Sequence, residues 1–272
     1  MLNLNTIQAL AIDMDGVLWR GDTPLPGLAN FFKFLDRREL PFVLATNNAS
    51  KTPVQYQQKL AGFGVAIKPE QVMTSSLATA AYLKDEFKNG ARVYVMGGDG
   101  LRQAMRDVGF TVVEDASQPA EAVVAGIDFG LTYDKLKYAT LLIQRGARFV
   151  GSNGDVTFPS EEGYYPGAGS ILAAVQAATK VKPVVIGKPE PFMFEIAMRK
   201  MGSQPEHTAM IGDRLETDIL GGQRAGLKTI LVTTGVDNAH TIEQKKIRPD
   251  MISAGLSELI DMWEKQSDIS PT

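Results

Sequence analysis

Two aspartates that lie one residue apart are the first residues in the chain whose type and spacing suggest chemistry. Asp13 and Asp15 stand in "IDMDGVL", behind an apolar run and next to Gly16. Two carboxylates this close repel each other, so both stay ionised only where a cation neutralises them, and otherwise one keeps its proton. An isolated Asp-x-Asp-Gly segment is often a turn held by side-chain hydrogen bonds. The pair therefore predicts either a cation site or a turn.

Polar residues follow three further apolar runs in the same way. They are Thr46, Asn47 and Asn48 after residues 42–45, Lys188 after residues 183–186, and Asp213 after residues 208–211. In an open parallel sheet, ligands bind outside the carboxyl ends of the strands. Carboxylates, an ammonium group and a hydroxyl gathered at that edge suit a hard cation together with a phosphate. The set of strand ends therefore favours a cation site over an isolated turn.

These residue types allow the steps of phosphate-ester chemistry to be assigned. Mg²⁺ needs few protein oxygens and leaves room for phosphate and water, and Asp13 and Asp213 are its natural side-chain ligands. A carboxylate can attack phosphorus, and a second one can give a proton to the leaving oxygen and later take one from water. We interpret Asp13 as the nucleophile and Asp15 as the acid/base. Lys188 would spread positive charge over the phosphoryl oxygens, and Thr46 would help to hold them.

The elements that position these residues alternate between strand and helix. Short apolar runs that end in polar or glycine residues and precede helical patterns are typical of βα units around a parallel sheet. The middle of the chain repeats this pattern with strands of its own, at residues 92–96, 122–125 and 148–151. We therefore predict an α/β fold with a parallel-sheet core, formed by residues 1–78 and 183–272, and a smaller inserted α/β domain, formed by residues 79–182.

The composition limits the chemistry further. The chain has 272 residues, 44% hydrophobic and 22% charged, which is typical of a globular protein with one large or two unequal domains. It has no cysteine, so disulfides, thiolate metal sites and cysteine nucleophiles are excluded, and neither His207 nor His240 has the setting of a ligand or base. A net charge of -3 argues against nucleic acid and anionic membranes and favours small-molecule partners. No signal peptide or bilayer-length apolar run is recognised, so a cytoplasmic location is expected.

Four short motifs along the chain resemble those of a known enzyme family. In order, "DMDGV", "ATNN", "GKPEP" and "GDRLETD" resemble the motifs of the haloacid dehalogenase (HAD) superfamily phosphatases, and most of all those of the NagD-like or p-nitrophenyl phosphatase subfamily. The resemblance covers essentially the whole chain. It implies a Rossmann-like core, a large α/β cap domain inserted between the second and third motifs, dependence on Mg²⁺ and a phosphoaspartate intermediate.

The same resemblance implies a role for each candidate residue. By motif match, the nucleophile is Asp13, the acid/base is Asp15, the phosphate-binding hydroxyl is Thr46, the stabilising lysine is Lys188 and the metal ligand is Asp213. The backbone carbonyl of Asp15 is a further metal ligand in the family. Asp218 would hold Lys188 or a metal-bound water, and Asn47 and Asn48 match substrate or phosphate contacts. Small esters of the p-nitrophenyl phosphate, nucleotide, sugar phosphate or phosphoglycolate type are the implied substrates, and a homodimer formed through the cap is a further expectation.

The leading hypothesis is therefore a Mg²⁺-dependent phosphatase, and two alternatives stay open. A phosphotransferase would pass the phosphoryl group from the same site to an acceptor hydroxyl. A catalytically silent protein would only bind phosphoesters, although a binder has no use for a proton-shuttling acid such as Asp15 beside a nucleophile. Dehalogenation is disfavoured, because carbon–halogen chemistry needs neither Mg²⁺ nor an acid at Asp15.

Overall fold

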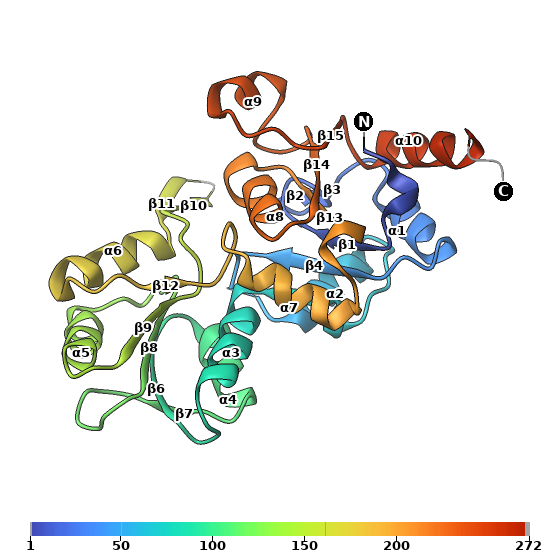
Figure 1. The fold of residues 1–272 in the computed structure, drawn as a ribbon. Helices are drawn as coiled ribbons and strands as arrows, with labels where there is room; N and C mark the ends of the chain where they lie inside the picture. Colours follow the sequence, from blue (N-terminus) through green and yellow to red (C-terminus); the bar gives the residue numbers. More distant parts are fainter. Residues whose placement is uncertain (1, 50, 161, 270–272) are drawn as a thin grey trace. The chain divides into compact units, whose positions relative to one another are not determined.

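The structure, a computed structural model, describes residues 2–49, 51–160 and 162–269. It consists of two compact units, and the sequence of the second is inserted into that of the first (Figure 1). The first unit comprises Met1–Thr46, Pro53–Met73 and Pro189–Thr272, and the second comprises Asn47–Thr52 and Thr74–Lys188. Each unit is built on a parallel β-sheet with helices, which confirms the predicted α/β fold class. The predicted limits of the insertion, 79 and 182, lie inside the second unit, and the domain assignment itself stays a prediction.

The first unit contains a six-stranded sheet in the order β15-β14-β13-β1-β4-β5. Its strands are β1 (Ala9–Ile12), β4 (Phe42–Thr46), β5 (Val72–Thr74), β13 (Thr208–Gly212), β14 (Lys228–Val232) and β15 (Met251–Ser253). β1 runs parallel to both β13 and β4, with Ile12 beside Ile211 and Leu44. Residues that follow β1 and β13 therefore come together at one edge of the sheet.

Helices and shorter elements complete this unit. The α-helices are α1 (Leu28–Arg37), α2 (Pro53–Gly62), α7 (Phe192–Met201), α8 (Leu220–Arg224), α9 (Ala239–Lys245) and α10 (Leu256–Ile269). The shorter turns are the 3-10 helices η1 (Leu4–Thr6), η2 (Pro69–Gln71) and η3 (Pro205–His207), and the π-helical turn η4 (Leu215–Ile219). The next two strands after β1, β2 (Trp19–Arg20) and β3 (Thr23–Pro24), form a small antiparallel hairpin.

Alternate residues of β1 pack on opposite faces of the six-stranded sheet. Leu10 and Ile12 belong to a buried apolar cluster with side chains of α1 and α10, whereas Ala11 packs with Phe194 of α7. All residues of β1 are buried, as expected for a parallel strand covered by helices on both faces. Full burial of a leucine or isoleucine side chain contributes roughly 1.5–3 kcal/mol. Turning β1 over would lose this burial, so the alternation fixes the orientation of the strand and of the residues that follow it.

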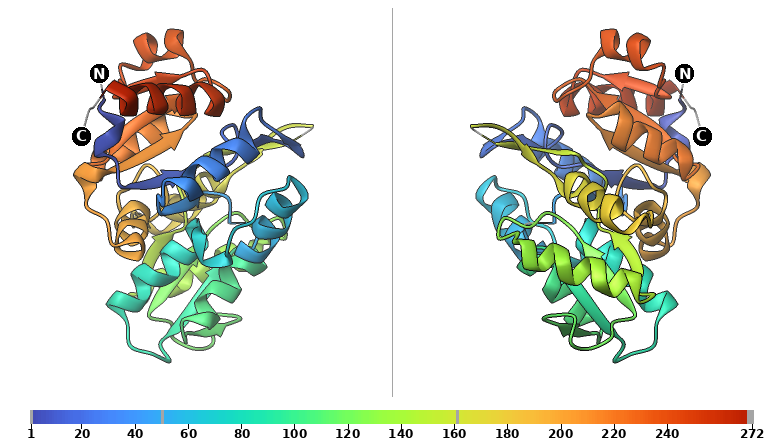
Figure 2. Two further views of the ribbon diagram at one scale, coloured as in Figure 1. Left: turned by 90° about the vertical axis from the view of Figure 1, so that its right-hand side faces the viewer. Right: turned by 90° about the vertical axis from the view of Figure 1, so that its left-hand side faces the viewer.

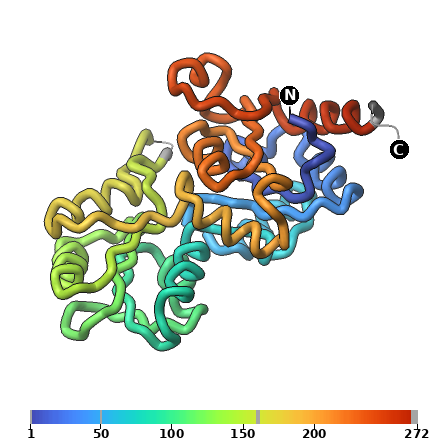
Figure 3. Tube along the Cα trace, viewed as in Figure 1, coloured from blue at the N-terminus to red at the C-terminus, as the bar shows by residue number. Residues whose placement is uncertain are grey.

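The N-terminal segment and α10 lie side by side in the first unit (Figure 3). The side chain of Gln266 in α10 accepts a hydrogen bond from the backbone N–H of Leu4 at 2.8 Å and donates one to the carbonyl of Leu2 at 3.2 Å. α10 is thereby tied to the segment that leads into β1. Among the helices of the described residues, none has the combination of length and apolar character that a bilayer crossing requires.

The second unit contains a five-stranded sheet in the order β12-β9-β8-β6-β7, and all of these pairings are parallel. Its strands are β6 (Arg92–Met96), β7 (Thr111–Val113), β8 (Ala122–Ala125), β9 (Arg148–Gly151) and β12 (Val184–Val185), and a separate antiparallel hairpin consists of β10 (Thr157–Ser160) and β11 (Gly163–Pro166). Helices α5 (Tyr133–Gln144) and α6 (Ala168–Thr179) lie together on one face of the sheet, as Figure 2 (right) shows. Helices α3 (Ser75–Glu86) and α4 (Asp99–Asp107) complete the unit.

One predicted strand belongs to the other sheet. The apolar run at residues 183–186 was expected in the parallel-sheet core, but its strand, β12, pairs with β9 at the edge of the second sheet, so that prediction is wrong. The run has the composition of any short parallel strand, and composition does not specify a partner. Lys188 therefore follows a strand of the second unit.

Candidate active site

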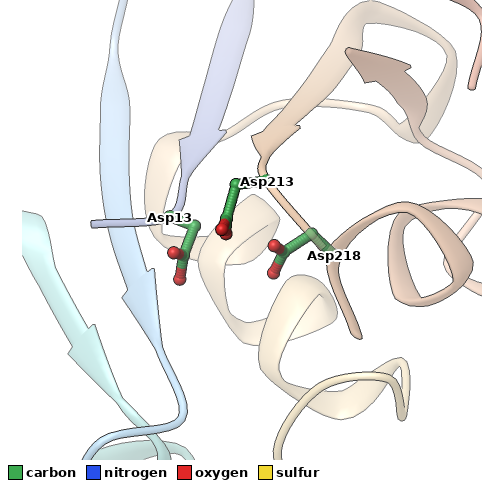
Figure 4. Close-up of side chains that lie close together, drawn as sticks. All are labelled: Asp13, Asp213 and Asp218. Atoms are coloured by element: carbon green, nitrogen blue, oxygen red, sulfur yellow. The ribbon is translucent and has the colours of Figure 1, made fainter. Parts of the chain in front are cut away.

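Three carboxylates of the first unit converge at the carboxyl ends of β1 and β13 (Figure 4). Asp13 directly follows β1 and Asp213 directly follows β13, while Asp218 lies in the π-helical turn η4. One carboxylate oxygen from each lies within 4.8 Å of those of the other two. Asp13 is 8% exposed, Asp213 2% and Asp218 1%. Three buried negative charges at this separation require a compensating cation if all are to stay ionised.

Backbone N–H groups orient two of these carboxylates. The N–H of Val236 donates to Asp213 Oδ2 at 2.8 Å, and the N–H of Arg214 donates to Asp218 Oδ2 at 3.0 Å. The backbone of Asp13 is fixed by the neighbouring strand, because its N–H donates to the carbonyl of Ile211 at 2.8 Å. Hydrogen bonds from the backbone leave these side chains little rotational freedom, so the carboxylate triangle is defined by the fold around it.

Glycines surround the Asp213 and Asp218 side chains at very short range. A Cβ atom at Gly16 would lie 2.4 Å from Asp213 Oδ2, and one at Gly235 would lie 1.8 Å from the same oxygen. At Gly212 a Cβ would lie 2.2 Å from the Cβ of Asp218. Gly16 also has φ +87, a left-handed conformation that other residues rarely adopt. Close approach to the carboxylates, rather than a turn alone, accounts for the glycine in "DMDG".

The donor set fits a hard divalent cation. In proteins, Mg²⁺ is held by carboxylate oxygens together with water and phosphate oxygens, and the buried triangle of Asp13, Asp213 and Asp218 offers carboxylate oxygens for such a site. From the sequence, Asp13, Asp213 and the backbone carbonyl of Asp15 were expected as metal ligands, and Asp218 was expected to hold Lys188 or a metal-bound water. Here the carboxylate of Asp218 lies within the triangle itself. The individual ligand assignments stay predictions.

The carboxylate of Asp15 contacts an aromatic side chain that was not among the predicted site residues. The indole Nε1–H of Trp19 donates to Asp15 Oδ1 at 2.7 Å. Trp19 is 1% exposed, whereas Asp15 is exposed. The sequence does not mark a buried tryptophan as a partner of a carboxylate four positions earlier, because the link depends on the turn that brings Trp19 back beside Asp15.

Tyr56 of α2 is a second unpredicted neighbour of the acidic pair. Burial raises the pKa of its phenol well above the ordinary range, and the negative charges of Asp15 and Asp13 raise it further, while a side-chain hydrogen bond with Thr46 works in the opposite direction. Thr46, 4% exposed at the end of β4, is thereby placed near the two aspartates, as its predicted role requires. Its contact with phosphate stays a prediction.

The remaining predicted residues lie in the second unit. The side-chain amide of Asn47 donates to the carbonyl of Lys188 at 2.8 Å and to Asp155 Oδ2 at 3.1 Å. The backbone carbonyl of Asn47 accepts hydrogen bonds from Ser75 Oγ and Asn153 Nδ2. Asn47 therefore ties the segment that follows β4 to the segment that carries Lys188, which is itself 2% exposed. The predicted phosphate contacts of Asn47, Asn48 and Lys188 stay predictions.

An ion pair between buried Asp237 and half-buried Lys245 supports the loop that carries Asp213. The N–H of Asp237 donates to the carbonyl of Asp213 at 3.0 Å, and Asp237 Oδ2 accepts the N–H of Leu215 at 2.8 Å. Lys245 of α9 lies 3.0 Å from Asp237 Oδ1. Burial acts to raise the pKa of Asp237, but the Leu215 N–H and the Lys245 ammonium outweigh it and hold that pKa below its usual value. Asp237 thus supports the loop that carries Asp213.

Comparison with known proteins identifies the family to which this site belongs. Residues 10–111 match the family described as haloacid dehalogenase-like hydrolase, and residues 185–259 match one described as HAD-hydrolase-like. The chain belongs to the haloacid dehalogenase-like hydrolase family. This confirms the family that was inferred from the four motifs.

Relatives within the family are similar over nearly the whole chain. An acid sugar phosphatase of Staphylococcus epidermidis is 39% identical over 258 residues, which are 95% of this chain and 98% of that protein. The structure of a 4-nitrophenylphosphatase from Thermotoga maritima is 35% identical with a TM-score of 0.90, covering 97% of this chain and 100% of that one. NagD from E. coli K-12 is 33% identical with a TM-score of 0.85, covering 93% and 98%. The chain is therefore an enzyme of the phosphatase branch of this family, as predicted.

Proposed function

We propose that this enzyme is a Mg²⁺-dependent phosphatase that hydrolyses small phosphomonoesters through an aspartyl-phosphate formed on Asp13. The observation that carries the proposal is the buried triangle of Asp13, Asp213 and Asp218, with Asp15 beside it at the end of β1. When bound there, Mg²⁺ would neutralise the carboxylates and the phosphate charge and so allow an anionic nucleophile to approach an anionic ester. Sugar phosphates and p-nitrophenyl phosphate are the first substrates to test, in view of the names of the relatives. We place the enzyme in the cytoplasm.

In the first half-reaction, a carboxylate oxygen of Asp13 attacks phosphorus and the ester P–O bond breaks. Asp15 donates its proton to the departing oxygen, so that the alcohol leaves neutral. We assign to Lys188 the stabilisation of charge on the phosphoryl oxygens and to Thr46 a hydrogen bond to one of them. The products of this step are the free alcohol and an acyl phosphate on Asp13.

In the second half-reaction, water attacks the phosphorus of the acyl phosphate. Asp15, now ionised, takes a proton from that water, and the bond between phosphorus and Asp13 breaks. Inorganic phosphate leaves, Asp13 is regenerated as a carboxylate and Asp15 is again protonated. One acid therefore serves both half-reactions, which requires its carboxylate to stay in place throughout.

Phosphate release from a panel of phosphoesters, with Mg²⁺ or with a chelator, tests the proposal. We expect release that depends on Mg²⁺, near-complete loss in Asp13→Asn, and a fall of roughly 10²–10⁴-fold in Asp15→Asn. Acid quenching during turnover of a ³²P-labelled ester should leave label on the peptide that contains Asp13. Unchanged activity in Asp13→Asn would contradict the mechanism.

The same panel separates the two alternative functions. A phosphotransferase would release phosphate slowly until an acceptor alcohol is added, and would then form a new ester in preference to phosphate. A silent phosphoester-binding protein would release none under any condition, while still binding the esters. Release at full rate in water alone supports hydrolysis.

A further inference from the structure

Trp19 makes a hydrogen bond that packing alone does not explain. Its side chain is 1% exposed and lies in an apolar cluster, yet its Nε1–H donates to Asp15 Oδ1 at 2.7 Å. A buried indole N–H needs an acceptor, and here that acceptor is the carboxylate to which we assign the proton transfers. Indole is a donor only: it cannot accept a proton or compete with Asp15 for one.

The indole ring is held from several sides. It stacks on Tyr56 with ring centroids 6.3 Å apart and 20° between the planes, and Phe63 lies 6.2 Å away. The ammonium group of Lys59 lies 4.8 Å from the ring centroid and also donates to the carbonyl of Gly21. A cation over the face of an aromatic ring is attracted to that ring, so the contact with Lys59 helps to hold the indole in this position.

The backbone connects this ring to Asp15 over a very short path. The N–H of Gly16 donates to the carbonyl of Trp19 at 2.8 Å, and the N–H of Leu18 donates to the carbonyl of Met14 at 2.8 Å. Asp15 and Trp19 also form an isolated β-bridge. The indole donor and the carboxylate therefore belong to one closed turn whose geometry is defined by its own hydrogen bonds.

We propose that Trp19 is a positioning residue for Asp15. Its N–H holds Oδ1 and thereby directs the other carboxylate oxygen, Oδ2, to the place where the proton is exchanged in both half-reactions. This inference rests on the proposed acid/base role of Asp15. Without the indole donor, the exposed Asp15 side chain rotates among several conformers, and only a fraction of the enzyme has the acid in position.

Trp19→Phe tests this role, because it keeps an aromatic ring against Tyr56 and removes only the donor and part of the ring area. We expect kcat to fall on the order of 10- to 100-fold with KM little changed, because binding does not depend on the proton transfer. For esters whose first half-reaction limits turnover, the fall should be larger for sugar phosphates than for p-nitrophenyl phosphate, since nitrophenolate leaves without needing a proton. The matched control is Trp263→Phe in α10: Trp263 is 2% exposed and packs on Phe34 at 5.5 Å.

A double-mutant cycle separates this proposal from the proposed function. In an Asp15→Asn background, Trp19→Phe should add little further loss, since the group that it positions has already gone. If Asp15→Asn alone is fully active, the acid/base assignment fails and the Trp19 proposal fails with it. If Asp15→Asn is impaired but Trp19→Phe, folded as judged by its thermal transition, has the kcat of Trp263→Phe, only the Trp19 proposal is overturned.

Fluorescence gives a readout that does not require Trp19→Phe to fold. The chain contains two tryptophans, so Trp263→Phe leaves Trp19 as the sole indole reporter. Replacing Asp15 by Ala in that background removes the acceptor of the indole N–H and should shift the emission of Trp19. An emission spectrum that is the same with and without the Asp15 carboxylate would show that the hydrogen bond does not form and would overturn the proposal.

Discussion

Gly16→Ala should weaken Mg²⁺ binding more than it weakens the fold. An added Cβ would lie 2.4 Å from Asp213 Oδ2 and 2.7 Å from its Cγ, where ordinary contact begins at 3.4 Å, so the carboxylate has to move by about 1 Å. Mg²⁺ requires oxygen ligands at about 2.0–2.1 Å in near-octahedral geometry, and a functional metal site tolerates deviations of only about 0.2 Å. A loss in Mg²⁺ affinity on the order of 10- to 100-fold is expected, similar to that seen when groups that orient a metal ligand are removed.

Gly64→Ala is a control for the conformational strain that Gly16→Ala introduces. Gly64 has φ +77, close to the φ +87 of Gly16, but nothing lies within 4 Å of an added Cβ there. Both variants therefore carry the left-handed strain of roughly 1–2 kcal/mol, and only Gly16→Ala displaces Asp213. The assay is phosphate release as a function of Mg²⁺ concentration, together with thermal unfolding with and without Mg²⁺. Equal Mg²⁺ requirements in Gly16→Ala and Gly64→Ala would refute the reasoning, because the clash with Asp213 would then have no effect on the metal.

Three further predictions follow from buried polar groups. The pKa of Asp237 is lowered in the folded protein, so its ionised carboxylate stabilises the fold fully above the ordinary pKa of an aspartate. This stabilisation is lost as the pH falls through the lowered pKa of the folded state. Asp237→Asn should therefore make the free energy of unfolding fall less steeply in acid, as measured by denaturant unfolding across that pH range. The raised pKa of Tyr56 keeps its phenol neutral, so Tyr56→Phe should leave the alkaline limb of the kcat profile unchanged; a shift of that limb would assign the ionisation to Tyr56. Asn47→Ala removes hydrogen bonds to the Lys188 carbonyl and to Asp155 and should lower the free energy of unfolding by about 1–3 kcal/mol, as measured in urea, whereas a loss within experimental error would mean that water replaces the amide.

Much of the site could be predicted because its residues are tied to local patterns. Asp13 and Asp213 directly follow short apolar runs, and two such runs that form neighbouring parallel strands necessarily bring their carboxyl ends together. The order of the motifs then indicated the family. These inferences needed only the positions of residues relative to strand ends, which are written in the sequence.

Other features depend on contacts that no local pattern encodes. The strand before Lys188 pairs with the second sheet, because a short run of valines fits the edge of either one. Asp218 enters the carboxylate triangle through the path of η4, and Trp19 reaches Asp15 through the turn that closes between them. Each of these depends on where the backbone turns after an element has ended. Turn geometry at that level depends on the surrounding packing as well as on residue type.

The π-helical turn η4 makes one carboxylate depend on chain length rather than on residue type alone. The N–H of Ile219 bonds to the carbonyl of Arg214, five residues earlier, so the turn contains one residue more than an α-helix would need. Deleting a single residue between Arg214 and Asp218 would allow the segment to wind as an ordinary helix and would rotate the Asp218 side chain by about 100°. A homologue that keeps every acidic residue but is one residue shorter here would therefore lack the third carboxylate of the site. An insertion or deletion in this segment is as informative about the carboxylate triangle as the loss of an aspartate.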